Sequence, residues 1–345
     1  MKLSELGEFG LIARLTADLE TDAAVVKGVG DDAAVLRCGR RWLLFTTDVL
    51  VEGVHFRRDF ASLQDIGYKS LAVNISDIAA MGGRPTYAVV TACLPPSLTA
   101  KEAAALYDGL KEAARAWGVS VVGGDTTAAP LLVLNVALLG EAAPGRVRFR
   151  SGAEPKDIVC TTGPLGAAAA GLFLLQNEGF PCPEPLRNIL LRRHRRPEPR
   201  VKAGLALAGI PAVHALIDVS DGLASEVHHL AAASGVGCEI YRAAIPVEPA
   251  TEFVARRAGR DPVDWALFGG EDYELLFTVA PQALGEISHA LAKAGAGCHP
   301  VGTITAEKGV WLLLPDGSRQ ELPAGGYDHF KQPDGKFSPE NGNNY

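Results

Sequence analysis

Short apolar segments alternate with longer segments of helical periodicity along most of this chain, and this alternation restricts the possible folds more than any other feature. Trp42 to Phe45 is an apolar run typical of a strand, and apolar residues between Ile66 and Ile78 recur at roughly helical spacing. Val119 to Val122 and Leu131 to Leu139 read as further strands, with Gly123 to Thr127 between them. Strands that alternate with helices indicate α/β domains.

Two of the predicted helices have clear start and stop signals. Ser62 to Asp65 and Thr99 to Glu102 fit the capping-box pattern, in which a hydroxyl and a carboxylate three residues later satisfy free backbone N–H groups. Met81-Gly82-Gly83 ends the first helix and Trp117-Gly118 ends the second. Thr86 to Leu94 lies between them and reads as a strand.

A polar segment rich in proline and glycine, Glu141 to Asp157, separates two such alternating halves. The chain has 345 residues, of which 48% are apolar, enough for two cores. We therefore predict an N-terminal domain over residues 1–148 and a C-terminal α/β domain over residues 149–330. The polar tail at 331–345 is rich in glycine, asparagine and proline, so we expect it to be disordered.

The charge and the cysteines exclude several classes of protein. A formal net charge of −7 argues against binding to nucleic acid or to an anionic membrane, both of which need a basic face. No apolar run reaches the ~18 residues of a membrane span, and the N-terminus lacks the apolar core of a signal peptide. The six cysteines are widely spaced, which fits free thiols in a reducing cytoplasm.

Five short aspartate motifs carry the chemical signal. They are Gly30-Asp31-Asp32, Thr46-Thr47-Asp48, Asn74-Ile75-Ser76-Asp77, Gly123-Gly124-Asp125-Thr126-Thr127 and Asp218-Val219-Ser220-Asp221-Gly222. Each one alone is explained by a turn or a helix cap, although Asp77 inside an apolar helix is costly to bury without a partner. No cationic side chain occurs within the motifs, so divalent cations are the natural partners if the carboxylates converge. Mg²⁺ prefers such oxygen ligands together with waters and phosphate oxygens, which indicates several metal ions and a phosphorylated ligand.

Several common ways of handling a nucleotide or a metal are absent from the sequence. It contains no P-loop, no H-R-D with D-F-G, and no H-E-x-x-H or other zinc spacing. An enzyme that moves the terminal phosphoryl group of ATP would therefore depend on the scattered aspartates.

Longer runs around these motifs resemble the thiamine-monophosphate kinase family. They occur in order along residues 5 to 330, and they comprise Gly28–Val35, Thr46–Phe56, Gly67–Gly82, Gly123–Thr127, Arg150–Ala153, Asp218–Leu223 and Gly269–Leu275. As a set they are highly specific, and none is degraded, which implies an active enzyme. The wider superfamily includes the aminoimidazole ribonucleotide and selenophosphate synthetases and a hydrogenase-maturation protein.

The resemblance implies a two-domain α/β (α+β) fold like that of aminoimidazole ribonucleotide synthetase, with the N-terminal domain forming the dimer sheet of a homodimer. It implies ATP- and Mg²⁺-dependent phosphorylation of thiamine monophosphate to thiamine diphosphate, with Asp48, Asp125 and Asp221 as catalytic residues. The metal ligands carried over by motif are Asp32, Thr46, Thr47, Asp48, Asp77, Asp125, Asp218 and Asp221. The ATP contacts are Tyr107, Gly124, Asp125, Arg150 and Ser220, and the substrate contacts are His55, Glu271 and Tyr327. Glu271 and the aromatic face of Tyr327 would suit the cationic thiazolium of the substrate.

Two alternatives stay open. The first is another ATP-dependent synthetase of the same superfamily. Selenophosphate synthetases carry a reactive cysteine near the N-terminus and the hydrogenase-maturation relative ends in one, whereas the first cysteine here is Cys38 and the last residue is Tyr345. The second is a non-catalytic sensor of nucleotide or thiamine phosphate, which should have lost some metal ligands. A calcium-binding structural protein would show a spaced D-x-[DN]-x-[DN]-G loop, which is absent.

Overall fold

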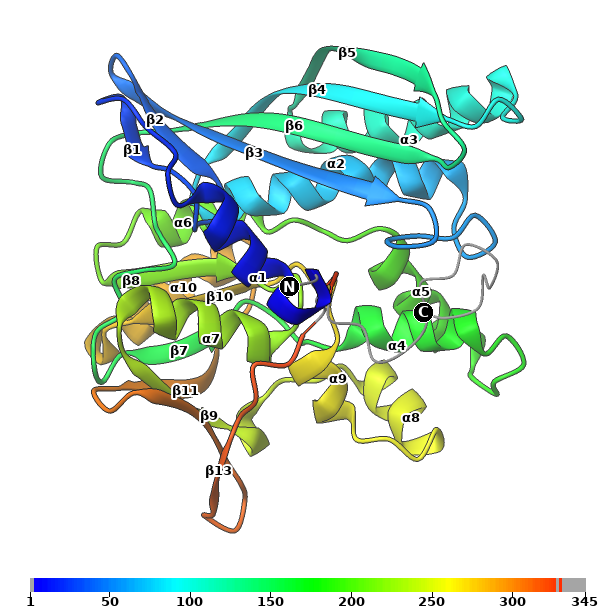
Figure 1. Ribbon diagram of the computed structural model, residues 1–345. Helices are drawn as coiled ribbons and strands as arrows, with labels where there is room; N and C mark the ends of the chain where they lie inside the picture. The colour runs from blue at the N-terminus through cyan, green and yellow to red at the C-terminus, as the bar shows by residue number, and fades with distance from the viewer. Residues whose placement is uncertain (1–2, 327–328, 331–345) are drawn as a thin grey trace.

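The computed structural model describes residues 3–326 and 329–330, whose strands form two sheets, one from each half of the chain (Figure 1). The first sheet has the order β1-β2-β3-β6-β4-β5, with β1 Val25–Lys27, β2 Ala34–Cys38, β3 Arg41–Val51, β4 Arg84–Leu94, β5 Ser120–Ala128 and β6 Val133–Ala142. The second has the order β13-β12-β9-β11-β7-β10-β8, with β7 Ile158–Thr161, β8 Val213–Asp218, β9 Gly237–Tyr241, β10 Leu275–Val279, β11 His299–Thr305, β12 Gly309–Leu313 and β13 Arg319–Glu321. The expected two-sheet α/β architecture is confirmed.

Helices pack on both sheets and between them. They are α1 Leu3–Thr16, α2 Leu63–Ala80, α3 Ala100–Trp117, α4 Ala167–Gln176, α5 Glu184–Arg195, α6 Val201–Ala208, α7 Leu223–Ser234, α8 Pro249–Arg257, α9 Pro262–Phe268 and α10 Leu284–Lys293, with short 3₁₀ helices at Arg242–Ala244 and Pro281–Ala283. Figure 1 shows α2 and α3 beneath the first sheet, and α2 also contacts β8 and α6 of the second half. Helix α2 is therefore buried between the two halves, which places its polar residues at the junction.

Helix α2 lies very close to α3 because two glycines face each other across the contact. A Cβ atom on Gly67 would lie 1.8 Å from the carbonyl oxygen of Leu106, and one on Gly109 would lie 1.8 Å from that of Gln64. Both helices begin as expected, since Ser62 accepts a hydrogen bond from the Asp65 N–H and Thr99 forms a complete capping box with Glu102. This rigid pair is the support on which the functional residues of α2 stand.

Two of the predicted strands are longer than the sequence indicated. Strand β3 continues through Thr46, Thr47 and Asp48 to Val51, and β5 contains the whole segment from Gly123 to Thr127, which we expected to connect two strands. Each of these segments pairs residue by residue with a neighbouring strand, β6 for β3 and β4 for β5. Pairing with a long neighbour outweighs the local turn preference of glycine, threonine and aspartate.

The outer face of the first sheet is apolar and exposed. Phe45 and Val49 of β3 and Tyr87 and Val89 of β4 each keep more than 40% of their surface accessible, and every residue of β5 is exposed. Such a face with an open edge strand is typical of a surface that another protein covers.

Within the described residues, no helix has the length and apolar character needed to cross a membrane. The domain limits at residue 148 and the expected disorder of the tail stay predictions, and 331–345 lie outside the described residues.

Candidate active site

Carboxylates from distant parts of the chain converge at the junction of the two halves. Ligand oxygens of Asp32, Asp77 and Asp218 all lie within 4.8 Å of one another. Asp32 precedes β2, Asp77 lies on α2 and Asp218 ends β8, so the cluster exists only in the folded chain. Asp48 of β3 is close enough for Asp77 and Asp32 to influence the pKa of its carboxyl. Of the metal ligands that the resemblance implied, Asp32, Asp77 and Asp218 thus lie together, and their role as ligands stays a prediction.

Neighbouring polar groups hold the carboxylates in fixed orientations. The hydroxyl of Thr46 donates to Asp77 Oδ2 at 2.6 Å, and the hydroxyl of Ser76 donates to Asp218 Oδ2 at 2.5 Å. Asn74 Oδ1 accepts a hydrogen bond of 2.9 Å from the N–H of Asp48. Helix α2 thus orients two aspartates that belong to other elements.

One cationic side chain, that of Arg150, lies at the cluster, although it belongs to none of the five aspartate motifs. Arg150 donates to Asp32 Oδ1 through Nη2 at 2.5 Å and through Nε at 3.1 Å. Its backbone N–H donates to Asp31 Oδ1 at 3.2 Å. Arg150 therefore sits at the site, where the resemblance had placed an ATP contact.

One arginine cannot balance this many buried carboxylates. Burial, together with the charge of Asp32, raises the pKa of Asp48 to about 6 and that of Asp218 to about 8. Burial and three neighbouring aspartates hold the pKa of Asp77 well above its usual value. Asp32 Oδ2 is buried and accepts no hydrogen bond from any residue that the structure describes. An all-oxygen set with an unpaired buried oxygen is suited to a hard divalent cation such as Mg²⁺.

A cavity of about 600 Å³ opens beside the cluster. Asp48 and Asp77 form one side of it, and Ser220 and Asp221 line it after β8. Burial, with the charges of Glu8 and Glu271 next, raises the pKa of Asp221 to about 7. Its lining also includes the aromatic residues Phe173, Trp265 and Phe268. The cavity therefore offers both carboxylates and aromatic faces to a ligand.

Two of the three expected substrate contacts line this cavity. His55 accepts a hydrogen bond from the Val51 N–H on Nδ1, and burial lowers its pKa to about 4. The ring is therefore neutral near pH 7 and carries its proton on Nε2, which leaves an N–H donor. Glu271 lines the same cavity, whereas Tyr327 lies outside the described residues.

Four of the expected site residues do not reach the cluster within one chain. The Thr47 hydroxyl hydrogen-bonds to Asn135 and Val136 on the outer face of the sheet, because side chains alternate along β3 and Thr46 and Asp48 point inward. Gly124 and Asp125 lie on β5, separated from β3 by β6 and β4. Tyr107 on α3 does not line the cavity.

The sequence reasoning did not identify two residues at the site, Lys69 and His194. Lys69 Nζ lies 2.5 Å from Glu271 Oε1, and His194 Nδ1 lies 3.1 Å from Glu271 Oε2. A signal for Lys69 was present, since a lysine inside an apolar helix is costly to bury without a partner. His194 is hidden in an arginine-rich stretch that gives no such signal.

Comparisons with known proteins find relatives along most of the chain. Two family models match, AIR synthase related protein, N-terminal domain, over residues 30–142, and AIR synthase related protein, C-terminal domain, over residues 154–313. The thiamine-monophosphate kinase of Bacillus subtilis (strain 168) is 39% identical over 330 residues, which cover 94% of this chain and 100% of that protein.

Solved structures give the same result. The structure of AaThiL complexed with AMPPCP and TMP has a TM-score of 0.85 and 35% identity, covering 95% of this chain and 99% of that chain. The crystal structure of thiamine-monophosphate kinase from Stenotrophomonas maltophilia K279a has a TM-score of 0.75 and 35% identity, covering 92% and 98%.

Proposed function

Since this chain belongs to the thiamine-monophosphate kinase family, we propose that its aspartates bind Mg²⁺ beside the phosphates of ATP and thiamine monophosphate. The chain is a kinase that uses ATP to phosphorylate thiamine monophosphate to thiamine diphosphate. The convergence of Asp32, Asp77 and Asp218 within 4.8 Å carries the proposal for the metal. Thr46, Asp48 and Asp221 complete the metal-binding residues that one chain supplies.

This phosphoryl transfer requires the protein to position the two phosphates and to neutralise their charge, and it requires little proton transfer. The acceptor is a phosphate monoester, ionised near pH 7, so its oxygen needs no strong general base. Bound Mg²⁺ would supply the positive charge that cancels repulsion between two polyanions and stabilises the transferring group. The catalytic role of Asp48 and Asp221 is then to hold that charge in place.

Arg150 and Ser220 are the ATP contacts that a single chain presents. Asp32 occupies Nε and Nη2 of Arg150, which leaves the Nη1 donors of its planar fork for a phosphate oxygen. Ser220 lines the cavity beside Asp221. His55 offers its Nε2–H to the substrate at the same cavity.

The remaining expected residues support a homodimer. Gly124 pairs with Val90 of β4, which pairs with Val136 of β6, which pairs with Asp48 of β3. The motif around Asp125 on β5 is therefore three strand spacings, about 14 Å, from Asp48 on β3. A second copy that covers the exposed apolar face of the sheet would bring its own Tyr107, Gly124 and Asp125 to this chain's site. Thr47 of each chain would then lie at the interface.

Mixing two inactive variants tests this arrangement. Asp77→Asn and Asp125→Asn would each be inactive alone, and subunit exchange between them should restore about a quarter of the sites if Asp125 serves the other copy's site. A mixture that stays inactive after proven exchange would place both residues in one chain's site and reject the shared arrangement.

The state of the cysteines supports a cytoplasmic location. All six are free thiols, and Cys160 and Cys238 are buried. Free thiols persist in a reducing compartment.

Product analysis tests the function directly. Purified protein with Mg-ATP is offered thiamine monophosphate, thiamine or aminoimidazole precursors, and ADP and product are measured. We expect ADP release and thiamine diphosphate with thiamine monophosphate alone. Turnover of an aminoimidazole precursor instead would identify a sister synthetase, and binding without any turnover would identify a sensor.

A further inference from the structure

The carboxylate of Glu271 has a buried basic side chain next to each of its oxygens. Lys69 Nζ of α2 lies 2.5 Å from Oε1, and His194 Nδ1 of α5 lies 3.1 Å from Oε2. Both partners are buried, Lys69 to 3% exposure and His194 to 8%. Lys69 comes from the N-terminal half and Glu271 from the C-terminal half, so this ion pair forms across the junction where the cavity lies.

The backbone around Glu271 keeps its carboxylate from moving away. Glu271 and Tyr273 have left-handed backbones, with φ of 69° and 51°, which non-glycine residues rarely adopt. Their N–H groups donate to the carbonyl oxygens of Ser220 at 2.7 Å and Val219 at 2.9 Å. Such strain persists only where the surroundings hold it in place.

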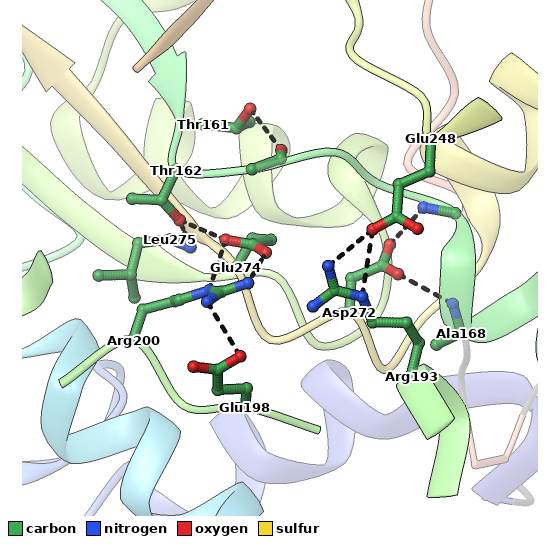
Figure 2. A network of polar contacts seen from close by, with 12 residues as sticks. Thr161, Thr162, Ala168, Arg193, Glu198, Arg200, Glu248, Asp272, Glu274 and Leu275 are labelled. Carbon is green, nitrogen blue, oxygen red and sulfur yellow. Dashed lines mark hydrogen bonds and ion pairs between the residues drawn. The ribbon is translucent and has the colours of Figure 1, made fainter. Parts of the chain in front are cut away.

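Two other acids of this segment, Asp272 and Glu274, hold its backbone in place (Figure 2). Asp272 accepts hydrogen bonds from the N–H groups of Gly166 at 2.6 Å and Ala168 at 3.1 Å, at the start of α4. Glu274 accepts from Arg200 Nε at 2.9 Å and from the Thr162 hydroxyl at 2.7 Å. With Asp272 and Glu274 fixed on one side, Glu271 is directed to the other, toward Lys69.

The charges of this group sum to zero. Burial alone would raise the pKa of Glu271, but Lys69 and His194 outweigh it and hold that pKa well below its usual range. Burial, and Lys69 after it, lower the pKa of His194, so its ring is neutral. A cation that approached Glu271 would also meet the ammonium of Lys69, and the repulsion would cancel much of the attraction.

A neutral N–H donor meets no such repulsion. Each carboxylate oxygen can accept more than one hydrogen bond, so Glu271 keeps lone pairs for a ligand while it pairs with Lys69. Hydrogen bonds to an ionised acceptor are roughly twice as strong as those between neutral groups. Thiamine monophosphate has both kinds of group, since its aminopyrimidine is neutral and its thiazolium is a cation.

Resting on the proposed function, we propose that Lys69 is a positioning residue for Glu271, and that the pair accepts a hydrogen bond from the aminopyrimidine instead of binding the thiazolium. This replaces the sequence-based expectation that Glu271 suits the cation. The aromatic wall at Trp265 and Phe268 provides faces for the thiazolium.

The variant Lys69→Met distinguishes the two modes by the sign of its effect. If Glu271 accepts from the aminopyrimidine, losing Lys69 misplaces the carboxylate, and KM for thiamine monophosphate rises about tenfold, the scale of one hydrogen bond to a charged group. The kcat and the KM for ATP should stay unchanged, and Lys69→Arg should restore most of the loss. If Glu271 bound the thiazolium, losing the competing cation would lower KM, and that result would overturn the proposal.

The 4-oxo analogue, oxythiamine monophosphate, tests the hydrogen bond itself, because it lacks the exocyclic amino group. Wild-type enzyme should prefer the amino substrate by about tenfold or more in kcat/KM, and Lys69→Met should lose most of that preference. Equal preference in both proteins would contradict the proposal. Lys111→Met is the matched control, since Lys111 pairs with exposed Asp108 on α3, and it should change nothing.

Two further measurements test the role of Lys69 if the single variant misfolds or if the proposed function is wrong. Should Lys69→Met misfold, the double variant Lys69→Met/Glu271→Gln removes both charges and should melt near wild type. It should also lose the preference for the amino substrate, and retention of that preference would overturn the proposal. If wild-type enzyme released no ADP with thiamine monophosphate, the proposed function would fail, and calorimetric binding of both compounds would still decide the role of Lys69.

Discussion

Replacing Ser76 by alanine removes one hydrogen bond between the two halves of the chain, and we expect this to weaken magnesium binding. Ser76 on α2 is fully buried, and its hydroxyl donates to Asp218 Oδ2 at 2.5 Å. A hydrogen bond to a charged group contributes about 1.5–3 kcal/mol, and loss of a partner that orients a metal ligand costs about 10–100-fold in metal affinity. The aspartates themselves remain in Ser76→Ala, so turnover at saturating Mg²⁺ should stay near wild type.

The assay is ADP release as a function of Mg²⁺ concentration, with a thermal melt of each protein. Ser70→Ala is the matched control, because Ser70 is also buried on α2 but its hydroxyl donates to the Gly67 carbonyl of its own helix at 2.9 Å. We expect the Mg²⁺ midpoint to rise about 10–100-fold in Ser76→Ala alone. Equal shifts in both variants, or none in Ser76→Ala, would refute the idea that this hydroxyl orients Asp218.

Three further predictions follow from the same geometry. Asp48→Asn or Asp125→Asn should lower turnover at least ~10²-fold at limiting Mg²⁺, and near-normal kinetics in both would reject their metal role. Because the folded-state pKa values of Asp48 and Asp218 are raised to about 6 and about 8, the metal-free protein binds more protons folded than unfolded and loses stability as pH rises through that range. The rise in Tm on adding Mg²⁺ should therefore be larger at about pH 8.5 than at about pH 6, and a pH-independent rise would contradict this. Gly67→Ala should cost about 1–3 kcal/mol in a denaturant melt because its Cβ meets the Leu106 carbonyl, whereas Gly10→Ala, whose nearest neighbour lies at 3.7 Å, should not destabilise.

Helix boundaries could be read from the sequence because their signals are local. The capping residues at Ser62 and Thr99 and the glycine at 118 each act within one helical turn, and the structure has both helices where these residues predict them. The ends of β3 and β5 could not be read in this way. Their last residues are held by pairing with β6 and β4, which lie elsewhere in the sequence.

The site was predictable as far as its chemistry needed unusual residues. An acid inside an apolar helix, Asp77, is costly to bury without a partner, so the sequence alone singled it out. Asp32 and Asp218 were named with it through the family resemblance, and the structure places the three within 4.8 Å of one another. The charge pattern did not identify Arg150 as the partner of Asp32, because an arginine among other linker arginines carries no distinguishing signal. The residues of β5 could not be placed at all, since their distance from the cluster follows from strand order.

Three pairings at the junction of the two halves link the proposed metal site to the proposed substrate site. Ser76 holds Asp218 and Lys69 holds Glu271, and in both pairs the N-terminal half supplies the residue that orients a carboxylate of the C-terminal half. In the third pairing, Arg150, which follows the first sheet in the sequence, donates a hydrogen bond to Asp32. Because Ser76 and Lys69 lie on the same buried helix, a shift of α2 against the second half would disturb the metal end and the substrate end at once. Rigid packing of α2 thus matters for the proposed function, since one helix sets the distance between the proposed metal-binding aspartates and the carboxylate that we propose selects the substrate.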